Sequence, residues 1–170
     1  QMADPGEKTF FDVGADDIQK EFDLNMRGTW LPSKVMTPLL IGQQGACVLN
    51  VSSMSAFTPL TRIPGYSGAK AGVSNFTQWL ATYLARSGVR VNAIAPGFFM
   101  TEQNHALQFN PDGTPTPRCA HIVDGTPMRR YGELRELIGA MLFLVDERAA
   151  SFVTGIVLPV DGGYSAFSGV

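Results

Sequence analysis

The chain has 170 residues, which suits a single domain, and its 45% hydrophobic and 16% charged residues are an ordinary globular balance. The formal net charge is −2 and no block of Lys or Arg stands out, so nucleic acid and anionic membrane are poor candidate partners. The two cysteines have no metal-ligand spacing, no apolar run could span a bilayer, and no signal peptide opens the chain. We therefore expect a soluble, cytoplasmic protein that holds no metal.

The first half of the chain predicts helix, strand and long helix. A helix is expected from Asp16 or Asp17 to about Leu40, with a bend at Pro32. The apolar run 46–53 is typical of a buried parallel strand, and a loop with two prolines follows it. Residues 66–86 then predict a long helix, ended by Ser-Gly at 87–88. Its apolar side is expected to hold Val73, Phe76, Leu80, Tyr83 and Leu84.

The second half alternates in the same way. A strand is expected over 89–95, closed by Pro96-Gly97, followed by a short helix within 98–109 and a Pro- and Gly-rich loop over 110–118. Residues 132–147 predict an amphipathic helix, 155–160 a third strand, and 161–170 a tail. The inward side of the amphipathic helix is expected to hold Leu134, Leu137, Ile138, Met141, Leu142 and Leu144.

This alternation predicts an α/β fold with a parallel sheet and right-handed helical crossovers. Ligands of such sheets bind beyond the carboxyl ends of the strands. Ser53 follows the first predicted strand and Pro96-Gly97 follows the second, so the polar residues lie where a site is expected.

The strongest candidate for chemistry is the pair Tyr66 and Lys70. Four residues apart on a helix, they share one face, and a nearby ammonium stabilises a phenolate so that the phenol can exchange a proton. Small residues around them leave room for another helix or a ligand. Ser53 can offer a hydroxyl to a substrate oxygen, and the amide of Asn25 can hold a water. Each element alone has a plainer alternative: a surface pair, a turn or cap residue, or a helix-end amide.

Four motifs follow one another along the chain: LNVSS, then YSGAK with its tyrosine thirteen residues after Ser53, then VRVNAIAPGFFMT and FVTGIVLPVDGG. Their order resembles the short-chain dehydrogenase/reductase family, and the resemblance runs from about Phe22 to Gly163. It implies that Tyr66 is the general acid/base, that Lys70 supports it and binds the nicotinamide ribose, and that Ser53 polarises the substrate carbonyl. It implies further that Asn25 keeps a relay water and that four residues hold the nicotinamide carboxamide: Pro96, Gly97, Phe99 and Thr101. NAD or NADP is the implied cofactor, and a homotetramer the implied assembly.

One family feature is absent. No glycine-rich turn that would cradle a pyrophosphate follows a strand here. We therefore expect residues 1–170 to form the catalytic and C-terminal portion of a doubly wound, Rossmann-type domain, with the nucleotide-binding part missing. An alternative stays open in which this chain alone is inactive and acts only in assembly.

The substrate is a finer question than the reaction. The stretches SSMSAFTPLTRIPGYSGAK and PVDGGYSAFSGV resemble a subgroup of sugar-acid dehydrogenases that interconvert fructuronate and mannonate. Arg62, between Ser53 and Tyr66, could grip a carboxylate, and Gln103, Asn104 and His105 could bond sugar hydroxyls. A solvated loop charge is the plainer interpretation of Arg62. Gluconate and 3-oxoacyl substrates remain alternatives.

Overall fold

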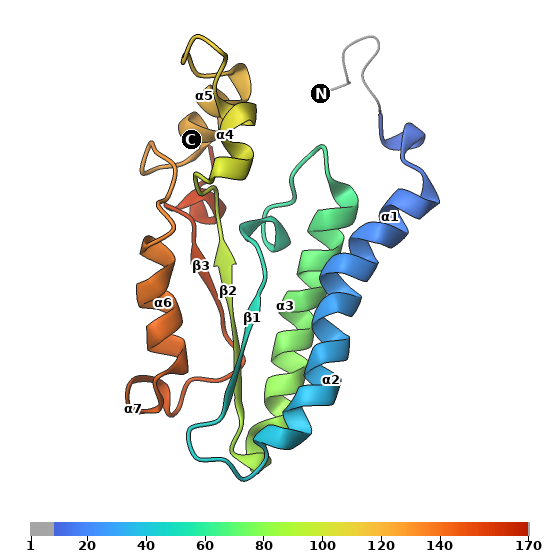
Figure 1. Ribbon diagram of the computed structural model, residues 1–170, viewed down its shortest axis with the longest axis vertical. Helices are drawn as coiled ribbons and strands as arrows, with labels where there is room; N and C mark the ends of the chain where they lie inside the picture. Colours follow the sequence, from blue (N-terminus) through green and yellow to red (C-terminus); the bar gives the residue numbers. More distant parts are fainter. Residues whose placement is uncertain (1–8, 170) are drawn as a thin grey trace.

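A computed structural model describes residues 9–169. A parallel sheet lies between two helical layers (Figure 1). One layer is a long helical rod packed beside a second long helix; the other is α6. The rod consists of α1 (Ala15–Phe22), a π-helical turn (Asp23–Arg27) and α2 (Gly28–Leu40), and its neighbour is α3 (Pro64–Leu84). The remaining helices are α4 (Glu102–Gln108), α5 (Pro117–Gly125), α6 (Glu136–Val145) and α7 (Glu147–Ala150).

The sheet has the parallel topology that the sequence predicts. Its strands are β1 (Cys47–Val51), β2 (Arg90–Pro96) and β3 (Val157–Val160), in the order β1-β2-β3. Val48 pairs with Val91, and Ile94 pairs with Leu158. All three strands therefore end at one edge, where α4 and α5 also lie (Figure 1). The central strand β2 is buried along nearly its whole length, as expected for a strand covered on both faces.

The core fills the space between α3 and the sheet. Its cluster joins Phe76, Leu80 and Leu84 of α3 to Val89, just before β2, and Val91 within it. These α3 residues recur at intervals of four, so they project from one side of the helix. Tyr83 does not share that side, because 69% of it is exposed, and its expected place in the apolar face was wrong.

The small residues of α3 allow close packing of the rod. A β-carbon added at Gly72 would lie 2.8 Å from a sulfur atom of the rod, closer than real contacts allow. Three glycines one turn apart face the rod: Gly65 faces Glu21 and the backbone of Ile18, Gly68 faces Phe22, and Gly72 faces Met26. Of the two occupants that the sequence allowed for this space, another helix is the one present. The rod is thereby fixed against the helix that carries Tyr66 and Lys70.

Two local predictions need correction, and one irregular turn was not predicted. Helix α2 runs through Pro32, and a π-helical turn lies before it, at Asp23–Arg27. The predicted Pro- and Gly-rich loop ends sooner than expected, because Thr116 accepts a hydrogen bond from the amide of Cys119 and starts α5. In α6 only Leu144 is buried. Four residues predicted to face inward are 39–60% exposed: Leu134, Ile138, Met141 and Leu142. The helical period was right, but the period does not say what covers the apolar side.

Candidate active site

The predicted Tyr66–Lys70 pair meets the end of β1. The ammonium nitrogen of Lys70 donates a 2.9 Å hydrogen bond to the carbonyl oxygen of Val51, the last residue of that strand, and lies 5.7 Å from the centroid of the Tyr66 ring. Burial lowers the pKa of Lys70 below its ordinary value, because desolvation disfavours the charged form. A positive charge is thus held beside the phenol, at the sheet edge where ligands of this fold bind.

Ser53 lies two residues beyond β1 and is buried. It caps the short 3₁₀ turn Met54–Ala56, which packs against α3. Its oxygen accepts hydrogen bonds from the amide of Ser55 at 3.2 Å and from the hydroxyl of Ser55 at 3.0 Å. The turn after β1 therefore places Ser53 directly before a segment that packs against α3.

Asn25 lies in the π-helical turn of the rod. Its side-chain nitrogen donates to the Glu21 carbonyl at 3.0 Å and to the Glu21 carboxylate at 3.1 Å, so the amide oxygen faces away from Glu21. The hydroxyl of Thr29 donates to the backbone oxygen of Asn25 at 2.8 Å. Single π turns inside α-helices are frequent at functional sites.

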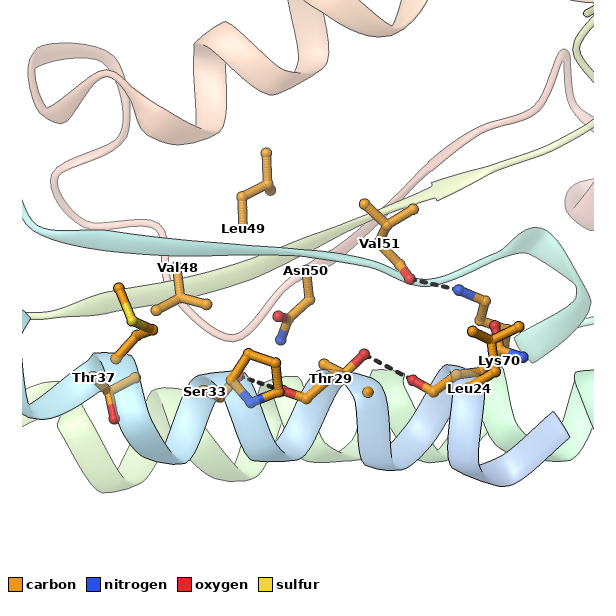
Figure 2. Close-up of a pocket in the computed structure, with 13 residues that line it drawn as sticks. Leu24, Thr29, Ser33, Thr37, Val48, Leu49, Asn50, Val51 and Lys70 are labelled. Carbon is orange, nitrogen blue, oxygen red and sulfur yellow. Dashed lines mark hydrogen bonds between the residues drawn. The ribbon is translucent and has the colours of Figure 1, made fainter. Parts of the chain in front are cut away.

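Asn25 and Lys70 both line a groove of about 500 Å³ between α2 and β1. Figure 2 shows Val48 and Asn50 directed from β1 toward the helix, Leu49 on the opposite side, and Lys70 beside the end of the strand. A space of this size between two polar groups can hold ordered water. The arrangement suits the water relay that the resemblance implies.

The segment 96–101 leaves β2 at the same edge and is held at both ends. The amide of Gly97 donates to Val160 at 2.9 Å, and Phe99 forms a parallel bridge with Gly132. A β-carbon at Gly132 would lie 2.5 Å from the Phe99 ring. Thr101 then caps α4. The four residues expected to hold the nicotinamide are thus gathered in one braced loop.

The residues expected to bind substrate lie on two separate segments of the chain. Arg62 is exposed in the loop that leads into α3. Asn104 uses its amide within its own segment: the nitrogen donates to the Phe99 carbonyl at 2.8 Å and the oxygen accepts from the Thr101 amide at 3.0 Å. The His105 ring lies against Phe109, and the side chain of Gln103 lies outside the described part. Contact of these residues with substrate stays a prediction.

Sequence reasoning missed two residues that touch the candidate site, Glu21 and Ser55. Both form side-chain hydrogen bonds with predicted site residues close by in the sequence: Glu21 and Asn25 are four positions apart, and Ser53 and Ser55 are two apart. The helical spacing of Glu21 and the cap pattern of Ser53 were visible in the sequence. What was missing was the knowledge that these local bonds would fall on the site.

A parallel sheet covered by helices on both faces, with polar candidate residues beyond the carboxyl ends of its strands, is the architecture of Rossmann-type proteins. A family model described as enoyl-(acyl carrier protein) reductase matches residues 2–165. The chain belongs to the short-chain dehydrogenase/reductase family. Among the described residues no His, Cys, Asp and Glu cluster could hold a metal, and no helix there is long and apolar enough to cross a membrane.

Curated relatives carry oxidoreductase names. An uncharacterized oxidoreductase of Haemophilus influenzae is 56% identical over 163 residues, which are 96% of this chain and 57% of the relative. A 3-oxoacyl-[acyl-carrier-protein] reductase of Synechocystis is 36% identical over 89% of this chain and 58% of its own. The chain therefore spans less than two thirds of these relatives.

Solved structures agree on the fold. A candidate D-mannonate oxidoreductase from Haemophilus influenzae with bound NAD has a TM-score of 0.94 and 54% identity, over 99% of this chain and 60% of that one. A candidate 2-deoxy-D-gluconate 3-dehydrogenase from Agrobacterium tumefaciens with bound NADP has a TM-score of 0.82 and 30% identity, over 94% and 63%. The Rossmann-type fold expected from the sequence is confirmed.

Proposed function

We propose that the whole protein is an NAD(P)-dependent oxidoreductase that interconverts a secondary alcohol and a ketone on a sugar acid such as mannonate. The observation that carries the proposal is the contact of the Lys70 ammonium with both the end of β1 and the Tyr66 ring. The name and bound NAD of the solved relative with 54% identity support the sugar acid and the cofactor.

The described residues fit the nicotinamide half of the cofactor. Lys70 is a half-buried cation beside a phenol, and the braced loop 96–101 leaves the next strand at the same edge of the sheet. Residues for the adenine half are not among those described, since they include no glycine-rich turn after a strand. The proposal therefore concerns the whole protein rather than residues 9–169 alone.

The site residues divide the proposed reaction among them. The nicotinamide, which Lys70 and the loop 96–101 would hold, would supply hydride acceptance from the carbinol carbon or hydride donation to the ketone. Tyr66 takes the hydroxyl proton of the alcohol, and Lys70 stabilises the resulting phenolate. Ser53 donates a hydrogen bond to the reacting oxygen as negative charge develops there. Because burial lowers the pKa of Lys70, the ammonium can pass a proton onward to water near Asn25.

The test is a substrate panel with the protein expressed from its complete reading frame. Rates with NAD and NADP are measured on D-mannonate and D-gluconate, and in the reducing direction on a 3-oxoacyl thioester. The proposal expects kcat/KM on mannonate to exceed the others by about tenfold or more, the scale that a few polar contacts give. A preference for the thioester would favour the alternative that the Synechocystis relative represents.

Arg62 gives a sharper test of the acid group. Arg62→Leu should raise KM for mannonate far more than for a neutral ketone, because a guanidinium pairs with carboxylate. Arg148→Leu is a matched control, since Arg148 is exposed and paired with Asp146 at the other end of the sheet. Equal effects of Arg62→Leu on both substrates would remove the carboxylate contact from the proposal.

An inactive chain is the second candidate, and the missing glycine-rich turn favours it. Titrating reduced cofactor into the 170-residue chain and following fluorescence separates the two. Tight, saturable binding would exclude the idea that this chain acts only in assembly.

We also propose that the whole protein forms a homotetramer through α2 and α3. Trp30, Phe76, Trp79 and Tyr83 form a continuous row of ring contacts across these helices, with centroids 5.1–6.1 Å apart. Three of these rings are 49–69% exposed: Trp30, Trp79 and Tyr83. Exposed aromatic rows of this kind mark interaction surfaces. Sedimentation of Trp79→Arg should then show smaller particles than wild type, and an unchanged tetramer would contradict this interface.

A further inference from the structure

The Ser53 hydroxyl accepts hydrogen bonds within the protein but donates none that the structure describes, and this affects how it can bind a substrate oxygen. A serine hydroxyl has one proton to donate and two lone pairs that accept. The backbone amide and the hydroxyl of Ser55 both donate to the Ser53 oxygen, at 3.2 Å and 3.0 Å. Both lone pairs of Ser53 are therefore occupied by one neighbour, and only the proton remains to be given.

Within the part of the chain that the structure describes, the Ser53 hydroxyl accepts two hydrogen bonds and donates none. The preceding serine is different. The Ser52 hydroxyl donates to the carbonyl of Lys70 at 3.2 Å and shares a 2.6 Å bond with Ser74, so its proton is used within the protein. Of these two adjacent serines, only Ser53 keeps a proton for a ligand.

The surroundings of Ser55 hold its hydroxyl in place as a donor to Ser53. It is 1% exposed and sits inside the 3₁₀ turn Met54–Ala56. The amide of Ala56 bonds back to the Ser53 carbonyl at 3.0 Å, which closes the turn. The C-terminal turn Tyr164–Ala166 lies against the same segment. The hydroxyl of Ser55 thus has little freedom to choose another partner.

We propose that Ser55 is a positioning residue that commits the Ser53 hydroxyl to donating its proton to the substrate oxygen. This inference rests on the proposed function, because it assigns Ser55 a part in the same alcohol–ketone interconversion. With both lone pairs filled, Ser53 cannot accept a hydrogen bond from the alcohol and stall it in an unproductive orientation. In ketone reduction, the fixed donor meets the negative charge that develops on the carbonyl oxygen.

The experiment is a double-mutant cycle in the protein expressed from its complete reading frame. Steady-state rates, cofactor binding and thermal midpoints are measured for wild type, Ser55→Ala, Ser53→Ala and the double variant. Ser55→Ala should lower kcat about five- to tenfold, the effect of one lost hydrogen bond, with KM and cofactor Kd within about twofold of wild type. In the Ser53→Ala background the same change should have no further effect, because Ser55 acts through Ser53.

Two further variants separate positioning from packing. Ser74→Ala is the matched control, since it removes another serine–serine bond without touching Ser53, and its kcat should stay within about twofold of wild type. Ser55→Thr keeps the hydroxyl and should recover kcat. An equal fall in kcat on removing Ser55 in the Ser53→Ala background would overturn the inference, as would an equal fall in Ser74→Ala.

A structural readout separates failure of the inference from failure of the proposed function. If wild type oxidises none of the sugar acids and reduces no ketone, the proposed function fails, and crystal structures of wild type and Ser55→Ala still decide the role of Ser55. The inference expects one Ser53 rotamer in wild type, bonded to the Ser55 hydroxyl, and a second rotamer in the variant. A single unchanged rotamer in both proteins would refute it.

Discussion

Replacing Gly97 with alanine should test how the site loop is fixed to the sheet. A β-carbon at Gly97 would lie 2.6 Å from the β-carbon and 2.7 Å from the α-carbon of Asp161. Neither atom can rotate away, since one is backbone and the other is directly attached to it. The loop could move only by weakening the 2.9 Å bond from the Gly97 amide to Val160. Overpacking of this kind costs about 1–3 kcal/mol, and we expect about 3 kcal/mol because backbone meets backbone.

The assay is urea unfolding of the protein expressed from its complete reading frame, followed by circular dichroism. Gly139→Ala is the matched control: Gly139 lies inside α6 with no atom within 4 Å of an added β-carbon. There alanine should stabilise by about 0.5–1 kcal/mol, because it favours the helix over the unfolded chain. A loss of less than about 0.5 kcal/mol in Gly97→Ala would refute the close approach of loop and strand end.

Two further predictions concern charge and the relay amide. Two hydrogen bonds from Arg130 and one from the backbone amide of Glu133 lower the pKa of Glu136 to about 2. The ionised carboxylate therefore stabilises the folded state at pH values above its unfolded pKa of about 4. This stabilisation is lost as the pH falls toward 2. Glu136→Gln should therefore have a lower thermal midpoint than wild type at pH 7, with the gap closing between pH 4 and 2; a gap constant over pH would contradict the ion pair. Glu21→Ala should lower kcat about three- to tenfold, because it removes one of the two hydrogen bonds that orient the Asn25 amide and leaves only the bond to the backbone carbonyl of residue 21. Glu21→Gln, which keeps a side-chain acceptor, should stay near wild type. Equal losses in both Glu21 variants would contradict this orienting role.

Much of the fold follows from the sequence because each element has a local signal. The apolar run that became β1 and the four-residue spacing along α3 needed no distant information. Helix α5 was missed because a Pro- and Gly-rich stretch directly precedes it, and one threonine cap decides where the loop ends. The outward side of α6 could not be predicted from its period, since burial depends on neighbours that the period does not name.

In the candidate site, too, local features could be predicted from the sequence, whereas contacts between distant residues could not. Spacing alone predicted that Tyr66 and Lys70 share a helix face, and the residues themselves made Ser53 and Asn25 candidates. The resemblance then implied a role for each of the four. The sequence could not show that Lys70 would bond to the end of β1, because that contact joins residues nineteen positions apart through the fold. Nor could it show that Asn104 would use its amide on the backbone of its own loop.

The central claim is that the Tyr66 hydroxyl moves the proton while hydride moves between substrate and nicotinamide. The most direct measurement is single-turnover formation of reduced nicotinamide by wild type and Tyr66→Phe, in the protein expressed from its complete reading frame. Loss of a general acid/base predicts a rate about 10²- to 10⁴-fold lower, with cofactor affinity within a few-fold of wild type. A Tyr66→Phe rate within about tenfold of wild type would contradict the account, because that is less than acid/base catalysis contributes.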